Sequence, residues 1–161
     1  MNKKAEKEVN HAENNARGWY ETIVEQVNAL EMDWERYQEL KEMNETDLTA
    51  DEKQELKELT ETAGEYESQD DVRQRIEESP LSIQTRGGWH NPGEQADDEE
   101  FEILLSTGGP ALRLIGELDQ YKQPEKCRLE HQDWGTPWTE LYNDVDPDIL
   151  QKWANVFYFG E

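Results

Sequence analysis

The chain has 161 residues, enough for one domain with a hydrophobic core or for a small domain with a helical extension. Its 39 acidic residues against 16 Lys and Arg give a formal net charge of −23, which disfavours direct binding to nucleic acid or anionic membranes and favours basic partners. Six Trp and six Tyr argue against a disordered acidic chain, so we expect a folded protein with an over-charged surface.

Secretion and membrane insertion are not expected from the sequence. The first residues, MNKKAEKEVNH, contain no apolar run, and no stretch approaches the roughly eighteen apolar residues of a membrane span. The single cysteine, Cys127, excludes an internal disulfide and fits a reducing compartment. These features predict a cytoplasmic protein without membrane contact.

The N-terminal part is expected to be helical. Residues 1–17 are polar and are predicted to form a flexible or frayed lead-in. From Gly18 onward, apolar side chains recur every three or four residues, which predicts one amphipathic helix ending near Met43. Its core face would carry Trp19, Ile23, Val27, Leu30, Trp34 and Tyr37.

Two further helices are predicted before residue 81. Thr49 and Glu52 match a capping box, which predicts a second helix ending near Thr62 with Gly64 as its C-cap. Ser68 begins a short third helix, which Pro80 ends. Residues 18–80 would therefore form an acidic helical hairpin followed by a short helix.

From Leu81 the apolar period changes from helical spacing to two, which is typical of strands. Four strands are predicted, near residues 81–86, 101–106, 111–119 and 127–134. Asp146 and Pro147 then begin a C-terminal helix. The predicted fold class is α+β, with a four-stranded antiparallel sheet over residues 81–161 covered by that helix.

Three sequence motifs and the C-terminal residues resemble those of a known group of proteins. The motifs are STGGPA (106–111), GELD (116–119) and QDWGTPWT (132–139), and the chain closes on FYFGE (157–161). Residues 80–161 thereby resemble small acidic proteins encoded by bacteriophages and other bacterial mobile elements. The resemblance implies a genetic setting, a phage or mobile element inside a bacterial host cell, more than a mechanism. That setting favours an anti-defence protein, anti-CRISPR or anti-restriction, as the concrete form of an acidic inhibitor. The resemblance implies no enzymatic activity and no functional residue.

Catalytic, metal and cofactor sites are not predicted. Cys127 and His131 would share one face of a strand but lie roughly 13 Å apart, too far for a thiolate–imidazole pair. The three His residues and one Cys show no zinc-binding spacing, and Gly108-Gly109 is typical of a turn rather than a phosphate loop. We therefore expect no enzyme, no metal and no cofactor.

The strongest indication of function is acidic charge on the predicted helices. Between Gly18 and Asp71, eighteen acidic residues stand against four basic ones. A helix over residues 18–43 would be roughly 39 Å long. Its net charge, counted with a second helix beside it, would be about one per 2.8 Å, against about one per 1.7 Å for duplex DNA. The predicted partner-binding carboxylates are Glu21, Glu25, Glu35, Glu39, Glu42, Glu58 and Glu61.

Two functions follow from this pattern. In the first, the protein inhibits a host defence complex, a basic protein or ribonucleoprotein, by occupying its nucleic-acid-binding surface through mimicry or steric block. In the second, it is an adaptor that binds proteins through an aromatic face of the sheet, with Trp134 and Trp138 as anchors. The helices would then be an accessory or dimerisation hairpin, in which Trp19, Trp34 and Tyr37 pair between two chains of a homodimer.

Overall fold

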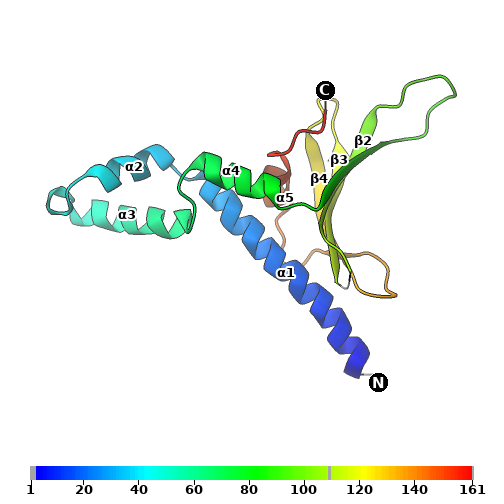
Figure 1. Cartoon of the computed structure of the whole chain (residues 1–161), viewed down its shortest axis with the longest axis horizontal. Helices are drawn as coiled ribbons and strands as arrows, with labels where there is room; N and C mark the ends of the chain where they lie inside the picture. Colours follow the sequence, from blue (N-terminus) through cyan, green and yellow to red (C-terminus); the bar gives the residue numbers. More distant parts are fainter. Residues whose placement is uncertain (1–2, 109, 161) are drawn as a thin grey trace.

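The computed structural model describes residues 3–108 and 110–160. It has the predicted α+β class, with an open antiparallel sheet and helices packed on one of its faces (Figure 1). The long helix α1 (Lys3–Glu31) and the C-terminal helix α5 (Pro147–Ala154) both contact the sheet at strand β4 (Pro124–Gln132). Of the predicted motif residues, Gly109 and Glu161 lie outside the described part, as do Met1 and Asn2 of the predicted lead-in.

The sheet has five strands rather than the predicted four. Its order follows the chain, β1-β2-β3-β4-β5, and every neighbouring pair is antiparallel. Besides β4, the strands are β1 (Ser82–Gly87), β2 (Asp98–Ser106), β3 (Ala111–Leu118) and β5 (Thr139–Leu141). The missed strand β5 has only three residues, too few to show a period of two.

One hydrophobic core joins the helices to the sheet. Alternate side chains of the central strands are buried, for example Ile103 on β2 and Leu114 on β3. They belong to the same cluster as Ile23 and Val27 of α1 and Trp153 of α5. The division into units 18–80 and 81–161 stays a prediction, and both stretches contribute to this cluster. Residues 3–17, predicted as a lead-in, lie in α1, where Ala12 and Ala16 are buried.

At position 116 the backbone of β3 lies so close to Phe101 and to the Glu125 carbonyl group that only glycine fits. A Cβ atom there would lie 2.8 Å from Cε1 of Phe101 and 2.7 Å from the Glu125 carbonyl oxygen. The space lets the Phe101 ring pack against Phe159, with ring centroids 4.9 Å apart. This contact attaches the C-terminal segment to the covered face of the sheet.

The prediction of a single helix over residues 18–43 is wrong, because the helix is interrupted at Met32 and Asp33. Helix α1 ends at Glu31, and helix α2 runs over Trp34–Glu42. The Asp33 side chain accepts a hydrogen bond from the Arg36 amide and caps α2. The Trp34 indole Nε1 donates to the Ala29 carbonyl oxygen at 2.7 Å, which satisfies an acceptor at the broken end of α1.

The hairpin consists of α2 and helix α3 (Ala50–Ala63), joined through a short 3₁₀ turn at Glu45–Asp47. It stands away from the sheet (Figure 1). The predicted capping box at the start of α3 is confirmed. Arg36 on α2 holds α3 through Glu55, at 2.9 Å, and Glu52, at 3.7 Å. Helix α4 (Gln69–Glu78) then returns the chain to the core through the predicted buried residues Val72 and Ile76.

Candidate partner-binding surface

A groove rich in carboxylates lies between the C-terminal half of α1 and the C-terminal end of α3. Its volume is about 760 Å³. Its lining includes five glutamates and no lysine or arginine: Glu25, Asn28, Glu31, Met32, Glu58, Glu61, Thr62, Ala63, Gly64, Glu65 and Tyr66. We call this surface the acidic groove.

Helical spacing and one glycine assemble the groove. On α3, Glu58 and Glu61 are three residues apart and therefore lie on one side of the helix. Gly64 ends α3 with a positive φ of 57°, a conformation that a residue with a Cβ adopts at a cost. The turn at Gly64 places Glu65 and Tyr66 in the lining of the same groove.

A buried hydrogen-bond network connects the groove to the core. The Trp153 indole Nε1 on α5 donates to Oε1 of Gln26 at 2.8 Å. The Gln26 Nε2 donates to the Tyr66 hydroxyl at 3.1 Å, and Gln26 is only 3% exposed. Because Tyr66 also lines the groove, this network fixes the connection between α3 and α4 against α1.

Two of the five glutamates have basic partners at the margin of the groove. Glu31 accepts from Lys152 at 2.8 Å, a hydrogen bond that raises the pKa of Lys152. Glu65 lies 3.4 Å from Arg75. Among the residues with described side chains, Glu25, Glu58 and Glu61 form no ion pair. Their negative charge is therefore available to a cationic partner.

The structure brings together part of the predicted acidic set. Glu25, Glu58 and Glu61 line the groove, and Glu21 is exposed one helical turn before Glu25. Glu31 and Glu65, which complete the groove, were not predicted as site residues. To predict them from the sequence, one would need to know where α1 ends and which way the chain turns after α3.

The other predicted glutamates lie on α2, outside the groove lining. Glu39 forms an ion pair with Arg36 at 3.4 Å, and Glu42 accepts a hydrogen bond from Gln38 at 2.9 Å. Glu35 is exposed in the first turn of the helix. The break at Met32 and Asp33 thus removes the single 26-residue rod on which the charge-spacing comparison with DNA was based.

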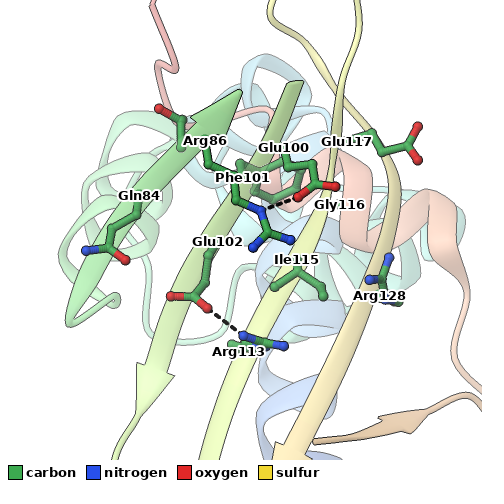
Figure 2. A pocket seen from close by; sticks show the side chains of 11 residues that line it. Gln84, Arg86, Glu100, Phe101, Glu102, Arg113, Ile115, Gly116, Glu117 and Arg128 are labelled. Atoms are coloured by element: carbon green, nitrogen blue, oxygen red, sulfur yellow. Dashed lines mark hydrogen bonds and ion pairs between the residues drawn. The ribbon is translucent and has the colours of Figure 1, made fainter. Parts of the chain in front are cut away.

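The uncovered face of the sheet forms a second surface, with a cavity of about 280 Å³ (Figure 2). Its charges are paired across strands. Arg113 lies 2.7 Å from both Glu102 and Glu130, and Arg86 bonds to Glu100. On this face each arginine therefore neutralises a neighbouring glutamate, whereas three glutamates of the acidic groove have no ion-pair partner among the described side chains.

The two predicted aromatic anchors lie in different surroundings. Trp138 is half-buried, with the Arg113 guanidinium 4.2 Å from its ring centroid. Trp134 is 81% exposed in the loop between β4 and β5. Trp134 is the aromatic side chain of this pair that a partner can reach.

The residues considered for catalysis are buried in the core. Cys127 contributes to the hydrophobic cluster, and burial raises its pKa to about 12. Burial also lowers the pKa of His131. Among the side chains that the structure describes, which begin at residue 11, no group of three or more His, Cys, Asp or Glu is placed to hold a metal ion. None of the described helices is both long and apolar enough to span a membrane.

Comparison of the chain with protein-family models, curated proteins and solved structures gives no match. The resemblance to phage-encoded acidic proteins stays a prediction from the sequence motifs.

Proposed function

We propose that the protein is an acidic inhibitor that occupies a basic nucleic-acid-binding surface of a bacterial defence complex, of the anti-CRISPR or anti-restriction kind. The observation that carries this proposal is the acidic groove, in which Glu25, Glu58 and Glu61 have no ion-pair partner among the described residues. The bacterial setting rests on the sequence resemblance alone.

The physical basis is replacement of phosphates by carboxylates. Helix α1 and helix α3 each contribute two glutamates to the groove, so a Lys- or Arg-rich segment between them would meet negative charge from both sides. Long-range attraction speeds such an encounter and weakens as salt rises, because ions screen charges beyond about 8 Å at physiological ionic strength. The protein would then block its target either by imitating nucleic acid or by covering the basic surface.

A second candidate is the adaptor function through an aromatic surface. The specific observation in its favour is Trp134, which is 81% exposed in the loop after β4. An exposed Trp in a loop is a frequent anchor of protein interfaces. The open face of the sheet itself is lined mainly by paired charges, so this candidate depends on the loop more than on the strands.

The test is a triple variant, Glu25→Gln, Glu58→Gln and Glu61→Gln, assayed against a panel of RNA-guided and restriction nucleases. We expect the triple variant to lose inhibition by about a hundredfold or more, because each lost charge pair weakens both encounter and complex. Binding of the unmodified protein should weaken steeply between about 50 mM and 300 mM salt.

The matched control changes the same number of charges outside the groove, with Glu94→Gln, Asp97→Asn and Glu99→Gln in the exposed loop before β2 and at its start. This control should inhibit as the unmodified protein does. Full inhibition by the groove variant would contradict the proposal. Loss of inhibition in Trp134→Ala combined with full inhibition by the groove variant would support the adaptor instead.

A further inference from the structure

Strand β1 is an open edge of the sheet. It pairs only with β2, and all six of its residues are exposed. Edge strands are usually protected by Pro, by Lys, by a bulge or by a covering element, since their free amides and carbonyls can pair with another chain. Within β1 the one charged residue, Arg86, bonds to Glu100 of β2, and the register shifts only at Gly87, the last residue.

Apolar side chains extend along this edge beyond the helical layer. Ile83 pairs with the buried Ile103 and therefore points to the helix-covered side of the sheet, yet it is 40% exposed. Leu81, on the same side two residues earlier, is 61% exposed. Trp89 follows β1 by two residues and is fully exposed. A protomer alone leaves these three side chains in water.

The charge of this segment favours a second copy of the same chain as the occupant. Residues 79–93 contain no Asp or Glu, although acidic residues make up 39 of the 161. Two copies that each carry −23 repel each other, and a strand without acidic residues of its own reduces that repulsion at the point of contact. The carboxylates of β2 that reach this strand, those of Asp98 and Glu100, are bonded to Thr85 and Arg86. A basic partner would be attracted to the acidic groove rather than to this edge.

We propose that the protein forms a symmetric dimer in which the β1 strands of two copies pair antiparallel and extend the sheet across the interface. A two-fold axis perpendicular to the sheet places residues of the same face opposite each other. With Thr85 opposite its own copy, Ile83 faces Gly87 and Leu81 faces Trp89. In this register Arg86 faces Gln84, so no like charges meet. The inference does not depend on the proposed function.

The test is sedimentation velocity of the full chain over a concentration series, at about 50 mM and 500 mM salt. We expect a dimer whose affinity increases with salt, because screening reduces the repulsion between the two copies. This direction is opposite to that expected for a complex with a basic partner. The two salt dependences therefore separate failure of one proposal from failure of the other.

Two edge variants and one control complete the experiment. Ile83→Lys should weaken the dimer at least about tenfold, because it places two charged side chains at the seam. Trp89→Ser should also weaken it, and this change is compatible with the fold because the side chain is fully exposed in the protomer. Thr139→Lys, on the edge strand β5, should leave the affinity unchanged.

A monomer at every concentration and both salt levels would overturn the proposal. A dimer that both edge variants leave intact would also overturn it, since its interface would then lie elsewhere. Circular dichroism checks the fold of each variant. If Ile83→Lys unfolds the chain, the result for Trp89→Ser decides.

Discussion

At the scale of single residues, Gln26 determines how the groove is attached to the core. Its amide is buried and hydrogen-bonded at both ends, to the Trp153 indole and to the Tyr66 hydroxyl. Replacement by leucine keeps the volume roughly similar but leaves a buried indole N–H without an acceptor. We expect Gln26→Leu to lower the free energy of unfolding by about 1–3 kcal/mol, measured by urea denaturation.

The matched variant for this prediction is Tyr66→Phe, which removes the hydroxyl and keeps the ring. It should cost less than Gln26→Leu, because Trp153 retains its acceptor. Gln26→Leu should also weaken partner binding while every groove carboxylate remains in the chain. If Gln26→Leu leaves the free energy of unfolding unchanged, the buried hydrogen-bond network contributes little to stability.

At the scale of elements, the capping box of α3 gives a local prediction that depends on pH. The Thr49 backbone amide donates to the Glu52 carboxylate at 3.0 Å and is the main cause of a lowered Glu52 pKa, to which the Thr49 side chain also contributes. A carboxyl group with a lowered folded-state pKa contributes stability that is present at neutral pH and is lost as pH falls through that lowered value. Thr49→Ala removes the side-chain hydrogen bond but keeps the backbone amide that donates to the Glu52 carboxylate, so the Glu52 pKa should rise only part of the way to its ordinary value, measured by NMR titration of the side-chain carboxyl.

The same variant should increase hydrogen exchange of the first-turn amides of α3 several-fold, since one capping acceptor is lost. Helix α4 offers the internal control, because its own cap, Ser68, is unchanged. Equal acceleration in both helices would indicate a global rather than a local effect. No change in the Glu52 titration would contradict a contribution of the Thr49 side chain and leave the backbone amide as the cause of the lowered pKa.

Comparison of the predicted and observed helices shows which of their boundaries could be predicted from the sequence. Local chemistry predicted the start of α3 at Thr49 and of α5 at Asp146, because a cap acts within four residues. The break before α2 was missed although Asp33 is a good cap, since Leu30, Trp34 and Tyr37 continue the helical spacing across it. Trp34 stabilises the break by a contact back to Ala29, which apolar periodicity does not reveal.

At the scale of the whole molecule, the acidic groove depends on packing between distant segments. Glu25 and Glu58 were predicted as exposed carboxylates on separate helices, but their sharing of one groove follows from the position of α3 beside α1. The contribution of Glu65 follows from the turn at Gly64. The residue types were therefore predictable, while the shape of the site required the tertiary structure.

The net charge of the molecule leads to a prediction about stability. Carboxylates that crowd one groove without basic partners repel each other in the folded state, at a cost of a few tenths of a kcal/mol per close pair. The triple variant Glu25→Gln, Glu58→Gln and Glu61→Gln should therefore raise Tm by about 3 °C at low salt. It should also reduce the increase in Tm with added salt, as measured by calorimetry.

The control is removal of carboxylates that do have partners. Glu102→Gln and Glu130→Gln take the same kind of charge from the molecule but leave Arg113 without its two ion pairs, so Tm should fall. A Tm increase in both sets would mean that net charge alone sets the stability. A Tm decrease in the groove variant would mean that its carboxylates stabilise the fold. A gain of stability together with a loss of partner binding, seen only in the groove variant, would show that these carboxylates serve binding at the expense of stability.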